Sequence, residues 1–543
     1  MLILEIDKFE KYYNDKCILK IDNLKIYSED RIGLVGPNGS GKTTLIKAVI
    51  GEDLEYKGVI KLNGNLSYIS QLSFDEDFLP AVPHSKLQSE FNVSNHSGLS
   101  SGEKTRLKIA ESLNKNSSII IADEPTNNLD MEGIDLFIEK MKKYKGAVLI
   151  VSHSRKVLDS LCSKILAIEE GEIKIYKGNY EEFKLQKKNQ QERDEFLYQE
   201  YEKEKRRLLS AIEEKKEKIN NIKNAPGRMG NSEARLHKMG GQKAKKKLDN
   251  SVKNMDKRMK KLEERKRPKD DAKMRISISS DIKLHSKIVI QGENINLSYG
   301  NKILYKNAEF KLYKDWKTGF FGPNGCGKSS LIKLITSRNS SISLAEKAEI
   351  GYFNQELNIL EDDKTVLENL KGNSSISEGE IRNLLSLLLF RGEDVYKTAG
   401  LLSGGERVKA SIGKLILMKP NLLLLDEPTN FLDIYSIEAL EAALKAYEGT
   451  ILFVSHDESF LNNISNHVMF IEDYKFKIVE GNFESYKEHQ DKSYYADIEN
   501  KKQVLQNRLS FVIGRLSMPS KKDNIEELNK EYESIIRELK EIN

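Results

Sequence analysis

The sequence carries GPNGSGKTTL at residues 36–45 and repeats it as GPNGCGKSSL at residues 322–331. IIIADEPTNNLD at residues 119–130 likewise returns as LLLLDEPTNFLD at residues 422–433. The first pair is offset by 286 residues and the second by 303, so the second copy has a net insertion of about 17 residues. Internal repeats at a matched spacing predict two homologous halves in one chain.

Short apolar runs lie beside these motifs, at residues 119–122 and 147–151 in the first half and at 422–425 and 451–454 in the second. Near-continuous apolar strands are typical of a largely parallel sheet that helices cover on both faces. We therefore predict an α/β fold with two tandem P-loop ATPase domains.

The segment between the halves has a different, helical pattern. Its apolar positions are spaced by three, four or seven residues in two runs, the second of which is a heptad seam. The first run is Leu197, Tyr201, Leu208, Ile212, Ile219 and Ile222, and the second is Leu248, Val252, Met255, Met259 and Leu262. Pro226 and nearby glycines interrupt the pattern, which indicates a long antiparallel helical hairpin. The C-terminus repeats this arrangement on a smaller scale.

These patterns divide the chain into four predicted segments. Residues 1–183 form ATPase domain 1, 184–283 a helical-hairpin linker, 284–489 ATPase domain 2, and 490–543 a helical extension.

The charge of the chain is concentrated in the linker. Residues 184–275 hold 30 Lys and Arg against 16 Asp and Glu, a net of +14, whereas the whole chain has a net of +5. The alternative interpretation is a solvated coiled coil, on which acidic residues usually balance basic ones. The excess of basic residues here favours a contact with a polyanion. The residues predicted to contact RNA or tRNA are Arg228, Arg235, His237, Lys238, Lys243 and Lys245.

The sequence gives no sign of export or of a membrane span. Its N-terminus has early acids, and nowhere do 18 apolar residues run together. Cys17, Cys162 and Cys326 lie far apart, which suits a reducing compartment. We expect a cytoplasmic protein.

The glycine-rich stretches sit where a strand is expected to lead into a helix, the context in which such a loop cradles phosphates. Main-chain N–H groups and the helix N-terminus supply positive potential there. Lys42 and Lys328 are expected to neutralise phosphate oxygens, and Thr43 and Ser329 to bind Mg²⁺, so ATP and Mg²⁺ are the predicted cofactors. The other residues predicted to bind the nucleotide are Gly36, Asn38, Gly39, Ser40, Gly41 and Thr44, with Gly322, Asn324, Gly325, Cys326, Gly327 and Ser330 in the second half.

Paired acids end the apolar strands of both halves. Asp123 and Asp426 are predicted to bind Mg²⁺, and Glu124 and Glu427 to act as general bases toward the attacking water. The alternative is that one or both acids of a pair are structural. Adjacent strand residues point to opposite faces, but at a strand end the second carboxylate can reach the attacking water.

Three further residue types recur in both halves. His153 and His456 each lie 30 residues after the Asp of the pair and are predicted to sense the γ-phosphate. Gln71 and Gln355 are predicted to assist at the metal. Tyr299 is a candidate for stacking on adenine. Tyr13 is the candidate in the first half, where Tyr12 competes for the role and core packing is the alternative.

LSSGE at residues 99–103 and LSGGE at 402–406 resemble the signature loop of ABC ATPases. In that family ATP lies between the P-loop of one half and the signature loop of the other. The resemblance implies that Lys42 faces Ser403 and Gly405, and that Lys328 faces Ser100 and Gly102. Ser101 replaces the usual glycine, which implies unequal sites.

Two cassettes, a charged helical linker and no membrane domain resemble the ABC-F class, whose members act on ribosomes from the tRNA exit site. The residues around 228–238 and the short first half resemble the Vga-type antibiotic-resistance branch. The first half is the shorter one between these two motifs: 28 residues separate Gln71 from Ser100, whereas 47 separate Gln355 from Ser403. The resemblance implies a monomer that binds 23S rRNA and P-site tRNA of the bacterial 70S ribosome. It also implies that the protein dislodges drugs of the lincosamide, pleuromutilin or streptogramin A type.

Three alternatives remain. A housekeeping ABC-F translation factor would have the same nucleotide sites without drug protection. The nucleotide-binding part of a transporter would leave the basic hairpin without a purpose. A DNA-acting ATPase would need a basic C-terminal hairpin, whereas residues 490–543 have nearly balanced charge. We therefore expect neither a membrane nor DNA as a partner.

Overall fold

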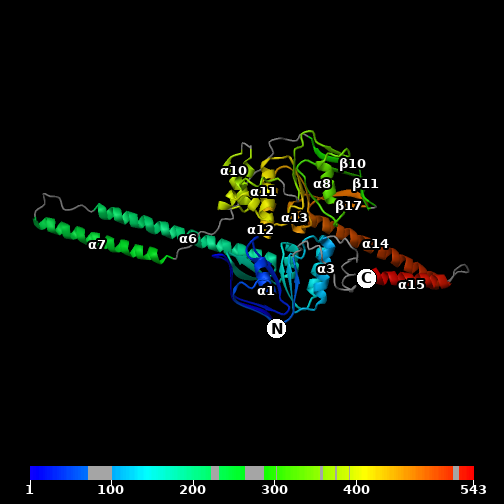
Figure 1. Ribbon diagram of the computed structural model, residues 1–543, viewed down its shortest axis with the longest axis horizontal. Coiled ribbons are helices and arrows are strands. Elements are labelled where there is room, and N and C mark those ends of the chain that lie inside the picture. Colours follow the sequence, from blue (N-terminus) through cyan, green and yellow to red (C-terminus); the bar gives the residue numbers. More distant parts are fainter. Residues whose placement is uncertain are drawn as a thin grey trace. The chain divides into compact units, whose positions relative to one another are not determined.

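The computed structural model describes residues 1–70, 101–221, 231–262, 286–300, 302–354, 359–372, 376–390, 392–517 and 525–542. The chain forms two compact units (Figure 1). The larger unit contains Met1–Ile175 and Met274–Asn543, so both halves of the repeat belong to it. The smaller unit is Tyr176–Lys273.

The first half is built on a sheet whose described strands run in the order β4-β1-β2-β9-β8-β3-β7-β6-β5. The strands are β1 (Leu2–Tyr13), β2 (Lys16–Tyr27), β3 (Arg31–Val35), β4 (Lys57–Leu62), β5 (Leu66–Ile69), β6 (Ile119–Asp123), β7 (Ala147–Val151), β8 (Lys164–Glu169) and β9 (Glu172–Lys177). The helices are α1 (Lys42–Ile50), α3 (Ser101–Asn114), α4 (Met131–Lys143) and α5 (Arg155–Leu161). Strands β5, β6, β7, β3 and β8 pair in parallel, as predicted.

The second half repeats this plan with two sheets, in the orders β14-β15-β16-β12-β17-β18 and β11-β10-β13. The strands are β10 (Ile288–Tyr299), β11 (Lys302–Tyr313), β12 (Lys317–Phe320), β13 (Ile342–Leu344), β14 (Ile350–Phe353), β15 (Leu422–Asp426), β16 (Thr450–Val454), β17 (His467–Glu472) and β18 (Lys475–Glu480). The helices are α8 (Lys328–Thr336), α9 (Val366–Lys371), α10 (Glu378–Leu387), α11 (Gly404–Leu417), α12 (Ile434–Ala446) and α13 (Glu458–Ile464).

The central strands of the large sheet in each half are fully buried. Every residue of β6, β7, β15 and β16 is buried, because helices cover both faces and the strands are apolar throughout. The ends of β6 and β15 are therefore held rigidly. Asp123 and Asp426 are the last residues of these strands, so their positions are fixed as well.

The smaller unit is the predicted helical hairpin, with α6 (Tyr180–Asn220) and α7 (Asn231–Lys261) lying side by side (Figure 1). Leu208, Ile212 and Val252 are buried in its seam. Arg258 and Glu204 form an ion pair across it, with 3.3 Å between Nη2 and Oε1. Helix α6 starts before residue 184, and the predicted segment boundaries remain predictions.

A second helical hairpin follows domain 2, formed by α14 (Phe483–Ser517) and α15 (Ile525–Ile542). Leu505 and Val512 of the first helix, and Leu528 and Ile535 of the second, are buried between them at heptad spacing. Helix α14 runs without a break through residue 490, so the C-terminal extension is an outgrowth of the last helix of domain 2.

Candidate functional site

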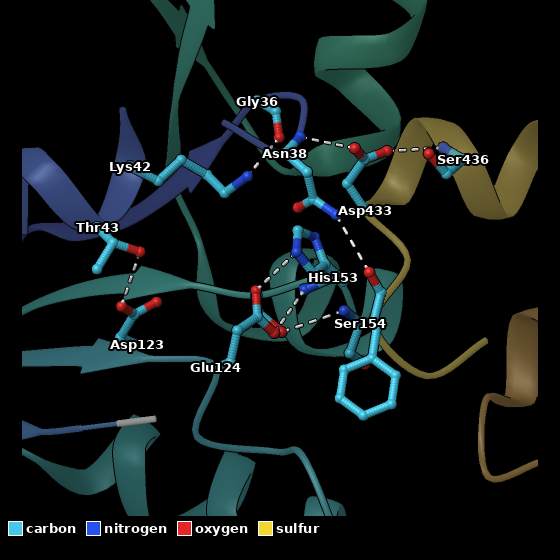
Figure 2. A network of polar contacts seen from close by, with 12 residues as sticks. Gly36, Asn38, Lys42, Thr43, Asp123, Glu124, His153, Ser154, Asp433 and Ser436 are labelled. Carbon is cyan, nitrogen blue, oxygen red and sulfur yellow. Dashed lines mark hydrogen bonds and ion pairs between the residues drawn. The ribbon is translucent and has the colours of Figure 1, made fainter. Parts of the chain in front are cut away.

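Both glycine-rich loops wrap around the ammonium group of a buried lysine. Lys42 Nζ donates to the carbonyl oxygens of Gly36 and Pro37 at 2.6 and 3.1 Å (Figure 2). Lys328 makes the two equivalent bonds at 2.9 and 3.0 Å. Burial lowers the pKa of Lys42, against the attraction of nearby acids. A buried ammonium that donates to carbonyl oxygens is well placed to receive a stronger, anionic partner.

The first residue after each lysine carries a hydroxyl that meets the acid at the end of a strand. Thr43 Oγ1 donates to Asp123 Oδ2 at 3.3 Å, and Ser329 Oγ donates to Asp426 Oδ1 at 3.0 Å. Burial raises the pKa of Asp123, while the Thr43 hydroxyl and Lys42 oppose that rise. Hydroxyl and carboxylate oxygens are the ligands that Mg²⁺ prefers.

The glutamate after each strand lies in the left-handed backbone region. Its φ angle is 48° at Glu124 and 50° at Glu427. Such a conformation costs about 1–3 kcal/mol for a residue with a side chain, so the surrounding structure must enforce it. The Glu124 N–H donates to Val151 O at 2.9 Å, which ties this turn to the neighbouring strand.

Each glutamate meets the histidine of its own half. Glu124 Oε1 lies 3.1 Å from His153 Nε2, and Glu427 Oε1 lies 3.4 Å from His456 Nε2 (Figure 2 shows the first pair). Burial raises the pKa of Glu124 to about 8, with Asp123 adding to the effect, and raises that of Glu427 to about 7. Burial and the nearby Lys328 lower the pKa of His456 to about 4, so its ring is neutral at physiological pH.

The first P-loop is held by the second half of the chain. The Asn38 N–H donates to Asp433 Oδ2 at 2.7 Å, and Asn38 Nδ2 donates to Phe431 O at 3.1 Å. A Cβ on Gly405 would lie 2.8 Å from Asn38 Nδ2, so the signature loop of half two approaches the P-loop of half one. The same Cβ would lie 2.7 Å from the backbone carbonyl oxygen of Phe431, so a side chain at residue 405 would require the backbone to shift.

The second P-loop is held reciprocally by the first half. The Asn324 N–H donates to Asp130 Oδ2 at 3.4 Å, and Asn324 Nδ2 donates to Asn128 O at 3.0 Å. A Cβ on Gly102 would lie 3.6 Å from Asn324 Nδ2. The halves therefore face each other head to tail, each P-loop against the signature loop of the other.

A cavity of about 1010 Å³ lies between the two halves. Its lining includes predicted site residues from both: Tyr13, Asn38, Gly39, Gly41, Lys42, Thr43, Thr44, Gly102, Asp123, Glu124, His153, Asn324, Gly325, Gly327, Lys328, Ser329, Ser330, Ser403, Gly405, Glu427 and His456. Among the predicted nucleotide-site residues that the structure describes, six stand outside this lining: Gly36, Ser40, Gly322, Cys326, Asp426 and Tyr299. Asp426 lies directly behind it against Ser329, whereas Tyr299 is exposed at the end of β10.

Several predicted residues lie outside the described residues or have side chains outside them. The first group is Gln71, Ser100, Gln355 and Arg228. The second is Ser101, Arg235, His237 and Lys238, whose backbones belong to α3 and α7. Lys243 and Lys245 are exposed on α7.

The sequence reasoning missed Asp130 and Asp433, which make the contacts between halves. Each also caps a helix, Asp130 accepting from the Gly133 N–H and Asp433 from the Ser436 N–H. The signal was present, since both aspartates end the repeated DEPTNxLD stretch. The last acid of the stretch follows the strand end and begins the next helix, so it lies where it can contact the opposite half.

A second missed feature is a buried ion pair between the halves. Arg155 Nη1 of α5 lies 2.9 Å from Glu441 Oε1 of α12, and both residues are less than 9% exposed. Beside it, Lys156 Nζ donates to Glu458 Oε1 at 2.7 Å. Charges of half one thus meet opposite charges of half two in a place shielded from solvent.

The donor set of each P-loop fits Mg-ATP. Lys42 is buried beside polar oxygens, and the buried Ser40 Oγ has no hydrogen-bond partner within the described residues. Gly39 and Gly41 have φ angles of 76° and 100°, which turn the loop tightly without side chains in the way. The Thr43–Asp123 pair supplies hard oxygen ligands next to this loop.

Comparisons with known proteins agree with this geometry. A family model described as ABC transporter matches residues 19–76, 71–127 and 305–430. MsrA of Staphylococcus epidermidis, an erythromycin resistance ATP-binding protein, is 32% identical over 466 residues, which are 82% of this chain and 93% of the relative. The chain belongs to the ABC-F family. As an ABC-F protein it is an ATPase, and the predicted family and fold class are confirmed.

Other relatives of this ABC-F protein differ in what their names say of them. The ribosome protection protein VmlR of Bacillus subtilis is 29% identical over 543 residues, 97% of this chain and 96% of VmlR. The energy-dependent translational throttle protein EttA of Escherichia coli is 28% identical over 565 residues, 91% of this chain and 96% of EttA. An archaeal ribosome recycling factor, aABCE1, solved in complex with stalk protein aP1, shares the fold with a TM-score of 0.57 and 18% identity, covering 90% of this chain and 92% of its own. Among the described helices of the ABC-F chain, none is long and apolar enough to cross a bilayer.

Proposed function

We propose that this ABC-F protein is an ATP-dependent ribosome-protection protein of bacteria. It binds the 70S ribosome at the tRNA exit site and uses its interdomain hairpin to dislodge antibiotics from the peptidyl-transferase region. The observation that carries the proposal is the likeness, over almost the whole length of both chains, to a named ribosome protection protein. The protein acts in the cytoplasm as a monomer, with 23S rRNA and P-site tRNA as its contacts.

The chain's own residues divide the work at each ATP site. Lys42 and Lys328 hold phosphate oxygens, while Thr43 with Asp123, and Ser329 with Asp426, hold the Mg²⁺, aided by Gln71 and Gln355. When bound, Mg²⁺ neutralises phosphate charge. The other proposed roles are these: Glu124 and Glu427 take the proton of the attacking water, His153 and His456 sense the γ-phosphate, Ser100 and Ser403 close the sites, and Tyr13 and Tyr299 stack on adenine.

Each ATP site needs both halves, which supports a cycle of closing and opening. ATP adds contacts that exist only when a P-loop and the opposite signature loop are together, so it shifts the population toward the closed form. Loss of the γ-phosphate removes those contacts. We propose that the closed form binds the ribosome and that hydrolysis releases it.

The net positive charge of the two hairpin helices lies on one of them. Helix α7 has eleven basic and three acidic residues, whereas α6 has eleven of each. A helix with a net charge of +8 gains affinity for RNA by releasing the counterions of phosphate groups. This supports α7 as the RNA-facing helix of the hairpin.

Removing charge from α7 is expected to weaken the salt dependence of ribosome binding. For Lys243→Ala with Lys245→Ala, the slope of log K against log salt falls in magnitude by about 1.5, because two phosphate contacts are lost. Co-sedimentation with ribosomes in ATP over a salt series measures this slope. The matched control is Lys203→Ala with Lys216→Ala on α6, which should leave the slope unchanged. An equal effect of both pairs would contradict an RNA contact specific to α7.

A second candidate is a housekeeping translation factor, because the identity to EttA is similar to the identity to VmlR. Protection of cells from drugs separates the two functions. Expression in a sensitive bacterial host is expected to raise inhibitory concentrations several-fold for at least one of lincosamides, pleuromutilins and streptogramin A. Erythromycin belongs in the panel because the name of MsrA includes it. Flat inhibitory concentrations for all four drugs would reject protection and leave the translation factor.

A further inference from the structure

A basic residue occupies the same position on both signature helices. Arg106 of α3 lies six residues after Ser100, and Lys409 of α11 lies six residues after Ser403. Both face inward, with Lys409 only 8% exposed and the Arg106 side chain 21% exposed. Each lies near the aspartate of its own half that contacts the opposite P-loop.

In the first half this cation is bonded to the aspartate. Arg106 Nη2 lies 2.7 Å from Asp130 Oδ1, which also accepts from the Gly133 N–H at 3.1 Å. The other oxygen, Oδ2, accepts from the Asn324 N–H of the opposite P-loop at 3.4 Å. These groups form a continuous chain from the signature helix of half one to the P-loop of half two.

In the second half, the carboxylate of the aspartate accepts hydrogen bonds from the opposite P-loop and from its own helix. Asp433 Oδ2 accepts from the Asn38 N–H at 2.7 Å and Oδ1 from the Ser436 N–H at 2.7 Å (Figure 2). The ammonium of Lys409 lies 5.0 Å from the centre of the Phe390 ring. Burial lowers the pKa of Lys409, and attraction to Asp433 is the strongest effect that opposes the shift.

The chemistry of the two cations accounts for the difference. A guanidinium is a rigid fork that forms short, charge-assisted bonds with a carboxylate, whereas an ammonium is a point charge on a flexible stem. Arg106 therefore draws the carboxylate of Asp130 toward its own helix. The bond of Asp130 to the opposite P-loop is 3.4 Å long, against 2.7 Å for its counterpart.

We infer that the cation at this position is a positioning residue that sets how firmly each half holds the opposite P-loop. With arginine in one half and lysine in the other, the two ATP sites are unequal. The site built on Lys42 and Ser403 binds ATP more tightly than the site built on Lys328 and Ser100. The inference rests on the nucleotide roles proposed above.

The test measures ATP affinity at one site at a time, in protein that carries Glu124→Gln and Glu427→Gln to block hydrolysis. Adding Lys328→Ala leaves the Lys42 site, and adding Lys42→Ala leaves the Lys328 site. Equilibrium dialysis with labelled ATP gives Kd for each. Arg106→Lys is expected to tighten the Lys328 site by about threefold to tenfold, the effect of one hydrogen bond. Lys409→Arg is expected to weaken the Lys42 site by a similar factor.

Site selectivity distinguishes positioning from a general structural effect. Both substitutions keep the charge, and the double exchange of Arg106→Lys with Lys409→Arg should reverse the order of the two affinities. If either single exchange shifts both sites equally, or shifts neither, the inference is wrong. If Lys42→Ala with Lys328→Ala still binds ATP at both sites, the proposed nucleotide roles have failed instead.

Discussion

Glutamine at both Glu124 and Glu427 is expected to lower ATP turnover by about 10²–10⁴-fold, the usual contribution of a general base. Glutamine has nearly the same shape as glutamate but takes no proton from water. The P-loop lysines and the opposite signature loops stay intact, so ATP remains bound. Steady-state phosphate release and equilibrium ATP binding, measured on the same protein, separate the two effects.

The same variant is expected to accumulate on ribosomes in ATP, because release requires loss of the γ-phosphate. Sedimentation with 70S particles measures this. The control is Glu172→Gln with Glu346→Gln, one exposed glutamate in each half, which should turn over ATP and leave ribosomes normally. Finding the Glu124→Gln, Glu427→Gln protein free of ribosomes in ATP would sink the proposed cycle, even if its turnover were lost.

The position of these glutamates was only partly predictable. The repeated DEPT stretches and buried apolar strands predict that Asp123 and Asp426 lie at strand ends, and they do. Strand alternation alone would direct the next side chain to the opposite face. The left-handed backbone at Glu124, φ 48°, instead places its carboxylate beside His153, and no propensity of glutamate indicates that conformation.

The ion pair between the halves was the least predictable contact. The repeat identifies residues that both halves share, so it indicates the P-loops, the paired acids and the histidines. Arg155 and Glu441 have no such signal: their equivalents, 303 positions away, are Glu458 and Ile138. The two residues are 286 positions apart, and the pair has no counterpart at the repeated positions. It can be identified only from the fold, which brings α5 against α12.

Breaking that pair is the second large effect we expect. Arg155→Met leaves Glu441 buried without its cation, a change that costs about 3–5 kcal/mol in proteins. The cost falls on the closed form, because opening the halves returns the carboxylate to water. We expect the ATP concentration needed for closure to rise by about tenfold to seventyfold, because about 1.4 kcal/mol corresponds to a factor of ten and two bound ATP molecules share the cost. Energy transfer between one dye on each half, followed during an ATP titration, measures closure.

Rescue separates the buried charge from lost packing. Arg155→Met combined with Glu441→Met replaces the pair by apolar side chains of similar length, and such replacements are often neutral. The double variant should therefore close at nearly the ATP concentration of the unaltered chain. Lys143→Met, which breaks the exposed pair of Lys143 with Glu139, is the control and should shift closure less than twofold. Closure of Arg155→Met within twofold of the unaltered chain would mean that the halves meet without relying on this pair.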